Sequence, residues 1–531
     1  MERGSSAFVK QAAILAGASI IVRFVGFLYR LPLTNLIGDE GNAYYNAGYQ
    51  IYTFFFILSS AGLPAAISKM VSERIALKRY RDAHAVFRCA LLIAAIAGIF
   101  CGLVVFFGAR FLSVLVEQPL SYYSLIALSP TLVIVGVMAV FRGYFQGMNN
   151  TVPTAVSQIM EQIFNAVFSV ILAYALFSKG VEFAAAGGTA GTGIGALAGL
   201  FAVGAIYYIA VPRIRKRALH APRQKQSNKS IAAEVLKTAL PIILGTAILS
   251  YSNLIDTLMI SKCLKASGAF DDVQISQMFG QFSGKYIVLV TLPVSISTAM
   301  AAAVIPSIAS SNAKGEKAAL NSKINMGIRL SMLISIPAAV GLSVLGDQVI
   351  RLLFPNASEG GILLQWGAAG IIFLALAQIA TGMLQGMGRV RIPVYGAVVG
   401  SIIKIPLNYL LISNPAINVV GAVISTMACY MAASVIDIIF LKKYTKIKLD
   451  FSGALLKPLL GSAIMGVACY IFYYTSYYLW SINALSTLIA VVAGIGIYFV
   501  SMLLLKGIIR SDLKSVPMGA KIIKIMDILK I

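Results

Sequence analysis

Eight basic residues lie inside long apolar stretches of this sequence, where a charge is energetically costly. They are Arg23, Arg30, Arg142, Lys237, Lys285, Arg329, Lys404 and Lys457. Moving an arginine or lysine to the centre of a bilayer costs about 2.5–3.5 kcal/mol on insertion scales. Both side chains also bind phosphate groups well. Embedded cations in this number predict a polar cavity for an anionic ligand.

Four of these cations are the strongest candidates for that cavity. Arg23 and Lys404 lie a dozen residues from the nearest end of their apolar stretch, which is about 18 Å at 1.5 Å per residue. Their side chains are too short to reach water from that depth. Arg30 and Lys285 lie nearer the predicted outer face but still inside the apolar stretch. We therefore expect Arg23, Arg30, Lys285 and Lys404 to hold the anion, with Arg142 as a further candidate.

Only three acidic residues, Glu161, Asp256 and Asp437, lie more than three residues from an end of their apolar stretch, so they cannot neutralise all the cations. Arg142 and Glu161 are on adjacent stretches, and a purely structural ion pair between them is an equally good interpretation. Asp256 and Glu161 are the candidate sites for a coupling proton or sodium ion. We expect no cofactor beyond such an ion and the membrane potential.

The elements that carry these residues are predicted to be transmembrane helices. The chain has 531 residues, of which 59% are hydrophobic and only 12% charged. About 20 apolar residues cross a bilayer as one helix. This window gives fourteen spans, near 11–37, 43–68, 88–110, 120–147, 153–178, 184–211, 232–261, 277–310, 322–347, 360–387, 392–413, 416–441, 455–479 and 483–506.

Loop charges support this assignment. Of the 43 basic residues, 30 lie at the termini and in the even-numbered loops, and only five lie in the odd-numbered loops. Basic residues are retained in cytoplasmic loops. We therefore expect a multi-pass protein of the cell membrane with both termini in the cytoplasm. The net charge of +24 then reflects loops beside anionic lipid rather than nucleic-acid binding.

Two short motifs recur and predict an internal repeat. Residues 144–148 (YFQGM) resemble residues 383–387 (MLQGM) at an offset of 239, and residues 62–68 (GLPAAIS) resemble residues 291–297 (TLPVSIS) at an offset of 229. These pairs map the second span onto the eighth and the fourth onto the tenth. Six spans per copy is an even number, so both copies keep one orientation, as in parallel repeats.

The expected fold is therefore all-α, with two six-helix lobes in parallel repeat and two C-terminal helices. The domain boundaries are residues 1–211 for the N-lobe, 212–230 for a basic cytoplasmic linker, 231–441 for the C-lobe, 442–506 for spans thirteen and fourteen, and 507–531 for a cytoplasmic tail. Apolar and basic residues alternate in the tail, which predicts an interfacial amphipathic helix. A disordered basic tail is the alternative.

Enzyme chemistry has little support in the sequence. The five cysteines form no CxxC pair, and the two histidines lie far apart in basic loops, so neither a disulfide framework nor a metal site is expected. The glycine-rich residues 187–195 lack the lysine of a phosphate-binding loop and open an apolar span, where small residues favour close helix packing. We expect a protein that is not an enzyme.

Several motifs resemble a known transporter family. They are Arg23–Arg30 (RFVGFLYR), Gly38–Gly41 (GDEG), Gly62–Lys69 (GLPAAISK), Arg142–Gly147 (RGYFQG) and Pro153–Gln162 (PTAVSQIMEQ). Together they are similar to the polysaccharide-transporter branch of the multidrug/oligosaccharidyl-lipid/polysaccharide exporter superfamily, which includes stage V sporulation protein B and Gram-positive lipid II flippases. The resemblance covers the first 165 residues, and the second half matches by helix count and repeat.

The resemblance implies a two-lobe flippase that moves a polyprenyl-diphosphate-linked glycan, lipid II first among them, from the inner to the outer leaflet by alternating access. Arg23 and Arg30 match the family's cavity arginines, and Lys285 matches a basic cavity residue loosely. Tyr44 and Tyr45 stand where lipid II flippases often carry further basic residues and a carboxylate. Spans thirteen and fourteen would form a groove for the polyprenyl tail. Cell-wall synthesis proteins are candidate partners besides the bilayer.

Three alternatives stay open, and a fourth is excluded. A flippase for another lipid-linked polysaccharide or a spore cortex precursor fits the same residues. A cation-coupled drug exporter of the same superfamily would favour acidic cavity residues, whereas embedded bases outnumber acids here. A non-transporting divisome or sporulation scaffold would carry its functional patches in loops or a tail, and these loops are short. A membrane acyltransferase or glycosyltransferase would need catalytic histidine or acidic clusters, which this sequence lacks.

Overall fold

The computed structural model describes residues 2–219, 227–447 and 449–507, and within them every regular element is a helix. The all-α prediction is confirmed, and each predicted span falls on helical residues. The α-helices are α1 Glu2–Phe56, α2 Leu63–Ala76, α3 Tyr80–Leu115, α4 Tyr122–Leu128, α5 Thr131–Gly147, α6 Val152–Leu176, α7 Val181–Leu219, α8 Asn228–Ala266, α9 Asp272–Gly280, α10 Ile287–Ala313, α11 Lys317–Val344, α12 Gly346–Leu353, α13 Gly361–Gly367, α14 Gly370–Gly386, α15 Arg391–Ile412, α16 Val420–Thr445, α17 Lys457–Trp480 and α18 Asn483–Leu504.

The described residues do not confirm the predicted count of fourteen membrane spans. Ten helices are long and apolar enough to cross a membrane, or twelve if two bent helix pairs each count as one span. The first of the ten, Gly17–Ala76, has 60 residues and contains both of the first two predicted spans. Fourteen therefore stays a prediction. Residues 220–226 of the predicted linker and 508–531 of the predicted tail lie outside the described residues.

The chain divides into two compact units. The N-terminal unit comprises Met1–Lys265 and Phe270–Gly280, and the C-terminal unit comprises Ala266–Ala269 and Gln281–Ile531. The helices α8 and α9, which the repeat assigns to the C-lobe, pack in this structure with the N-terminal unit. Ile231, Val235 and Ala239 of α8 lie in one hydrophobic core with residues of α2, α3 and α5.

Matching irregularities in the two units agree with the parallel repeat. The pair α4–α5 bends by 41°, and the corresponding pair α13–α14 bends by 56°. A π-helical turn, Ile57–Ala61, precedes α2 and its Leu-Pro motif, and a second one, Gln281–Tyr286, precedes α10 and its Leu-Pro motif. The helices α5, α6 and α7 of the first unit thus correspond to α14, α15 and α16 of the second.

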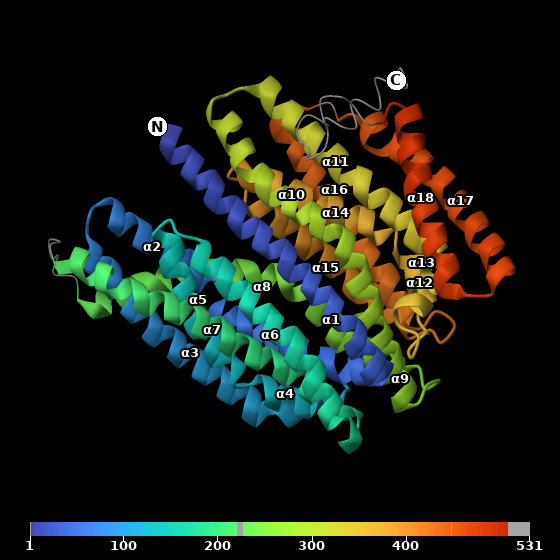
Figure 1. Cartoon of the computed structure of the whole chain (residues 1–531), viewed down its shortest axis with the longest axis horizontal. Coiled ribbons are helices and arrows are strands. Elements are labelled where there is room, and N and C mark those ends of the chain that lie inside the picture. Colours follow the sequence, from blue (N-terminus) through green and yellow to red (C-terminus); the bar gives the residue numbers. More distant parts are fainter. Residues whose placement is uncertain (1, 220–226, 448, 508–531) are drawn as a thin grey trace. The chain divides into compact units, whose positions relative to one another are not determined.

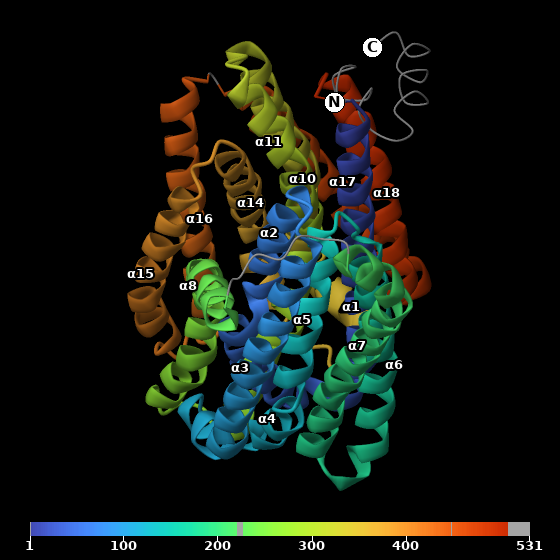
Figure 2. The same cartoon turned by 90° about the vertical axis from the view of Figure 1, so that its left-hand side faces the viewer.

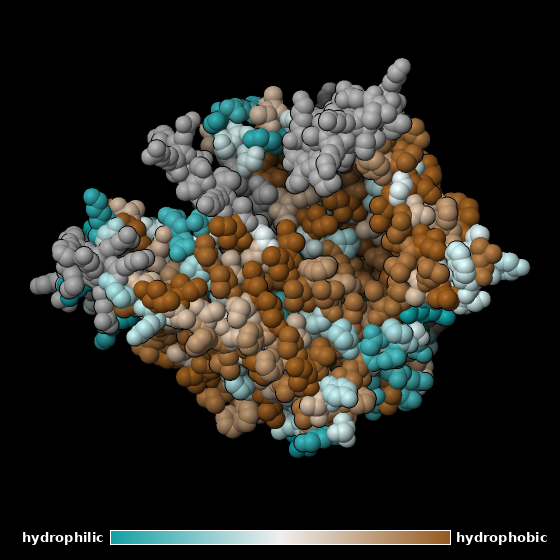
Figure 3. Space-filling model, in the orientation of Figure 1, coloured by the Kyte–Doolittle hydropathy of each residue, from teal (hydrophilic) through white to brown (hydrophobic). Residues whose placement is uncertain are grey.

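Long antiparallel helix pairs form the outer surface of each unit. The pairs α6–α7, α15–α16 and α17–α18 pack side by side along their lengths (Figures 1 and 2). Large apolar side chains are exposed on these helices and on α3, including Phe107, Phe201, Tyr409 and Val492. The surface in Figure 3 is accordingly dominated by hydrophobic residues. Exposed apolar surface of this extent marks a membrane-embedded protein, so the chain is a multi-pass membrane protein.

A glycine-dependent kink separates the first two predicted spans. Gly38 adopts φ 68° and ψ −170°, a conformation that L-residues rarely adopt, inside the otherwise continuous α1. The end of α9 lies against this kink, where a Cβ on Gly280 would overlap the carbonyl oxygen of Asp39. Both glycines, Gly38 and Gly280, are therefore needed for α9 to pack on α1 at this kink.

Candidate functional site

The guanidinium of Arg30 lies half-buried inside the N-terminal unit among neutral groups. Its Nη1 donates a hydrogen bond to Oδ1 of Asn46 at 3.1 Å, and its Cζ lies 5.1 Å from the centre of the Tyr45 ring. The Tyr45 hydroxyl is 3.3 Å from that of Tyr29. Amide and aromatic groups orient the guanidinium without cancelling its charge. Arg30 is thus a positioned cation with charge left for an anion.

Tyrosines extend this polar region along the second half of α1. Tyr45, Tyr49, Tyr52 and Phe56 follow at spacings of four, three and four residues, which places them on one helix face. Successive ring centres are 5.9, 5.7 and 6.3 Å apart. Tyr49 lies within electrostatic range of both Arg30 and Glu161. The aromatic wall therefore connects the Arg30 region to the next charged group.

Arg142 and Glu161 form an ion pair between α5 and α6. Nη2 of Arg142 lies 2.6 Å from Oε2 of Glu161 and donates a second hydrogen bond to the Ser157 hydroxyl at 2.8 Å. Ser157 in turn donates to the carbonyl of Gly199 on α7 at 2.8 Å. The structural pairing considered for these two residues is confirmed. Arg142 is neutralised in this conformation, unlike Arg30.

Arg23 is exposed on the first half of α1. It precedes Arg30 by seven residues, which is two helical turns, so the Cα atoms of the two arginines lie on the same side of α1, about 10.5 Å apart along the axis. Gly26 between them faces Gln162 of α6, whose Nε2 would be 3.4 Å from a Cβ at that position. The packing of α1 on α6 therefore brings Arg23 and Arg30 to the same unit as the Arg142–Glu161 pair.

The two lysines of the predicted cavity lie in the C-terminal unit and are buried. Lys285 is 1% exposed, and its Nζ donates to the carbonyls of Ala357 at 2.8 Å and Glu359 at 2.6 Å. In this conformation its ammonium holds the loop before α13. Lys404 is completely buried on α15, one turn before Asn408, which accepts a hydrogen bond from Ser425 of α16. Asp256, the other candidate coupling residue, is 3% exposed on α8 in the N-terminal unit.

An apolar groove of about 360 Å³ lies in the C-terminal unit. Helices α11, α17 and α18 form it, and its lining includes Pro337, Gly341, Met465, Cys469, Val491 and Ile495. Its walls carry almost no polar surface, which suits a hydrocarbon chain. The sequence resemblance implied a groove at the two C-terminal helices, and the structure has one there.

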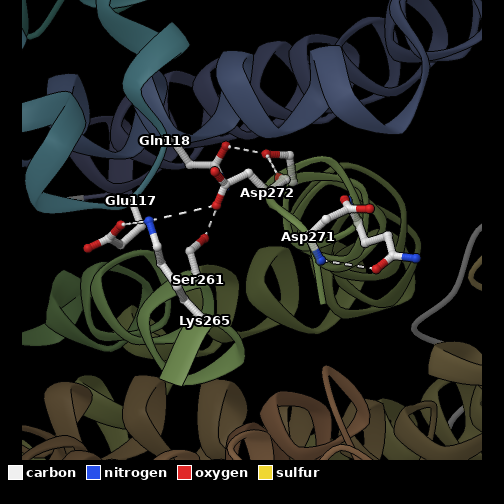
Figure 4. Close-up of polar contacts among 8 residues, drawn as sticks. Glu117, Gln118, Ser261, Lys265, Asp271 and Asp272 are labelled. Atoms are coloured by element: carbon white, nitrogen blue, oxygen red, sulfur yellow. Dashed lines mark hydrogen bonds and ion pairs between the residues drawn. The ribbon is translucent and has the colours of Figure 1, made fainter. Parts of the chain in front are cut away.

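A cluster of polar contacts fastens α8 and α9 to the connection between α3 and α4 (Figure 4). The buried Gln118 side chain donates to Ser261 of α8 at 3.0 Å and accepts from Ser276 of α9 at 3.0 Å. Beside it, Nζ of Lys265 lies 3.0 Å from Glu117 and 3.7 Å from Asp272. The hydrogen bond that the Lys265 ammonium donates to the Glu117 carboxylate raises the pKa of Lys265. These contacts hold the α8–α9 hairpin on the N-terminal unit.

The sequence predicted the charged residues of the candidate site but not the neutral residues that surround Arg30. Tyr29, Tyr45, Asn46 and Tyr49 surround Arg30 or extend from it, yet none was predicted as a site residue. Their signal was the repeated spacing of tyrosines within an apolar span. Among the described residues, no group of three or more histidine, cysteine, aspartate or glutamate side chains could hold a metal ion.

The sequence matches known families over most of its length. Residues 8–312 match the model of the family described as polysaccharide biosynthesis protein. The chain belongs to this family. Residues 241–410 also match the MatE family model.

Among the curated proteins similar to this chain is "Lipid II flippase MurJ" of Bacillus subtilis (strain 168), which is 28% identical over 492 residues, covering 87% of this chain and 88% of the relative. "Stage V sporulation protein B" of the same organism is 24% identical over 525 residues, covering 97% of this chain and 99% of the relative.

Solved structures share the fold. "Lipid II flippase MurJ, inward closed conformation" superposes with a TM-score of 0.68 at 16% identity, covering 93% of this chain and 98% of that structure. An inward-facing multidrug resistance MATE family transporter of the MOP superfamily gives a TM-score of 0.64 at 13% identity, covering 80% of this chain and 94% of that structure.

Proposed function

We propose that this protein is a flippase that moves a polyprenyl-diphosphate-linked glycan from the inner to the outer leaflet of the cell membrane, with lipid II as the first substrate to test. The observation that carries the proposal is Arg30, a half-buried guanidinium held by Asn46 and the Tyr45 ring inside an apolar unit. Retaining such a cation in a membrane-embedded unit is explained by an anionic substrate. The curated relatives of this chain include a lipid II flippase.

Each part of the proposed substrate has a candidate binding region in the protein. Arg30 and Arg23 would bind the diphosphate, for which a guanidinium provides paired donors. Tyr49, the partly exposed member of the row from Tyr45 to Tyr52, would offer its ring and hydroxyl group to the sugar, and the buried Tyr45 and Tyr52 would support it. The apolar groove between α11, α17 and α18 would hold the polyprenyl tail. Lys285 and Lys404 would contribute only in a conformation that frees their ammonium groups.

The membrane potential would supply the driving force. A negative-inside potential contributes about 2.3 kcal/mol per charge per 100 mV, which favours outward movement of an anionic head group. Both termini would lie in the cytoplasm, where the basic loops are retained. A coupling ion at Asp256 or Glu161 would return the empty protein. In this structure Glu161 is already neutralised by Arg142, so its role would require that pair to open.

The experiment is complementation in cells depleted of their own lipid II flippase. Outward-facing lipid II is read out by its cleavage with an externally added colicin. The chain should restore cleavage, Arg30→Lys should retain part of it, and Arg23→Ala/Arg30→Ala should lose it. Arg351→Ala is the matched control, because Arg351 is exposed on α12 and paired with Asp347 outside the proposed site. A well-expressed parent without activity would exclude lipid II, and an active double variant would exclude the arginine site.

A further inference from the structure

Asp437 is a buried carboxylate with one unpartnered oxygen in the C-terminal unit. It lies on α16 and is 2% exposed. Its Oδ2 accepts a hydrogen bond from the Thr381 hydroxyl of α14 at 2.9 Å. Its Oδ1 lies 3.3 Å from where a Cβ on Gly396 of α15 would be, and it has no hydrogen-bond partner among the described residues. The carboxyl group therefore lies where α14, α15 and α16 meet.

Among the described residues, no lysine, arginine or histidine forms an ion pair with Asp437. The charged groups on the helices packed around it are exposed, distant or bound to other residues. Helices α10, α13 and α14 contain no charged residue. On α15, Arg391 is exposed at the first residue, and Lys404 lies eight residues beyond Gly396, about 12 Å along the helix axis. On α16, Lys442 and Lys443 are exposed in the last turn. On α11, Lys317 is exposed, Lys323 binds Ser311, and Arg329 pairs with Asp450.

An ionised carboxylate in such a place would be strongly destabilising. Burying an unpaired charge costs far more than burying a neutral polar group, and buried acids usually take up a proton instead. A sodium ion or another hard cation would need several oxygen ligands. The Thr381 hydroxyl and the carboxylate itself supply too few. The geometry therefore fits a bound proton.

The N-terminal unit provides an internal comparison. The offset of 239 residues that relates Gln146 to Gln385 also relates Arg142 to Thr381 and Ser157 to Gly396. In the first unit, the arginine at this level neutralises the carboxylate of Glu161. In the second unit, threonine replaces that arginine, and the carboxylate comes from α16. One copy of the repeat thus has an ion pair at this level in this structure, and the other has a buried carboxylate with no cation beside it.

We propose that Asp437 is a proton-binding site of the C-terminal unit. Its carboxylate takes one proton from water to become a neutral carboxylic acid when α14, α15 and α16 enclose it, and returns the proton to water when they part. The proton site stands independently of the transported substrate. Its coupling to transport rests on the proposed flippase function, with proton release providing the step that resets the empty protein.

Infrared spectroscopy of the purified full-length chain in detergent tests the site without any substrate. The wild-type protein at neutral pH should show the carbonyl stretch of a protonated, buried carboxylic acid, and Asp437→Asn should lose that band. Asp347→Asn is the matched control and should retain it, because Asp347 is partly exposed and paired with Arg351. A band that persists in Asp437→Asn, or is absent from the wild type, would overturn the proposal.

A second variant covers the case in which Asp437→Asn fails to fold. Thr381→Val keeps the carboxyl group and removes the hydroxyl that donates to it, so the band should remain and shift in frequency. An unshifted band would mean that another acid produces it.

Proteoliposomes test the coupling separately. At a clamped potential, an imposed pH gradient should change the flipping rate of the wild type and leave that of an active Asp437→Asn variant unchanged. An equal response in both would refute coupling at Asp437, while a wild type without flipping would refute the flippase proposal and leave the infrared result standing.

Discussion

Removing one partner of the Arg142–Glu161 pair should destabilise the N-terminal unit, and removing both should cost less than the sum of the two single losses. The two groups are 2.6 Å apart, and their side chains are only 13% and 27% exposed. At that distance their attraction is about 6 kcal/mol with an effective dielectric constant of about 20, before desolvation is subtracted. Removing one partner of a buried pair costs about 3–5 kcal/mol. Because both groups retain some contact with solvent, we expect a loss of about 3 kcal/mol for Arg142→Met.

The assay is a double-mutant cycle on the free energy of unfolding in detergent. Arg142→Met and Glu161→Leu are measured alone and together, and the double variant should recover about 2 kcal/mol relative to the sum of the two single changes. The exposed pair Asp347–Arg351 is the control, and its cycle should give less than about 0.5 kcal/mol. Effects at Arg142 and Glu161 that add within about 0.5 kcal/mol would refute the conclusion that this pair is a coupled, buried unit.

Three further predictions follow from the packing. Gly280→Ala should lower the thermal unfolding temperature, because its Cβ would overlap the Asp39 carbonyl. The control Gly496→Ala on α18 should leave that temperature unchanged, because its Cβ would meet nothing within 4 Å. Equal unfolding temperatures for the two variants would contradict the close contact at Gly280. Gln118→Leu should lose about 1–3 kcal/mol of stability and speed hydrogen exchange in α9, since it removes the hydrogen bonds that link the Gln118 side chain to Ser261 and Ser276. Unchanged exchange in α9 would argue against the fastening role of Gln118. Gly341→Leu should narrow the apolar groove and slow the flipping of substrates with long lipid chains more than that of substrates with short ones. The control Gly496→Leu should slow neither. Equal slowing of both chain lengths by Gly341→Leu would contradict tail binding in the groove.

Much of the fold follows from local sequence properties. Apolar runs of about 20 residues place the helices, because a bilayer sets their length. The two short repeated motifs predicted two related halves, and the structure shows matching bends at α4–α5 and α13–α14. Neither bend was predicted, because the interruptions at residues 129–130 and 368–369 lie inside single apolar runs. The first two spans were predicted with a gap at residues 38–42, whereas α1 continues through a kink at Gly38.

The site was predictable only in part, for a physical reason. A charge in an apolar stretch is visible in the sequence, so Arg30 was found. What neutralises or orients a charge depends on contacts between distant residues. Lys285 holds carbonyls more than seventy positions away, and Asp437 faces Thr381 from another helix. Tyr45 and Tyr49 resemble ordinary hydrophobic residues until the fold places them near Arg30.

The most direct test of the central claim is flipping by the purified protein in proteoliposomes that contain a fluorescent polyprenyl-diphosphate-linked glycan. The fraction of substrate that reaches the opposite leaflet is measured with and without an imposed membrane potential. The wild type should flip the substrate, faster when the potential drives the anion outward, and Arg23→Ala/Arg30→Ala should reduce the rate to that of protein-free vesicles. A double variant that flips at the wild-type rate would contradict the account, because the diphosphate would then have no need of the arginines of α1.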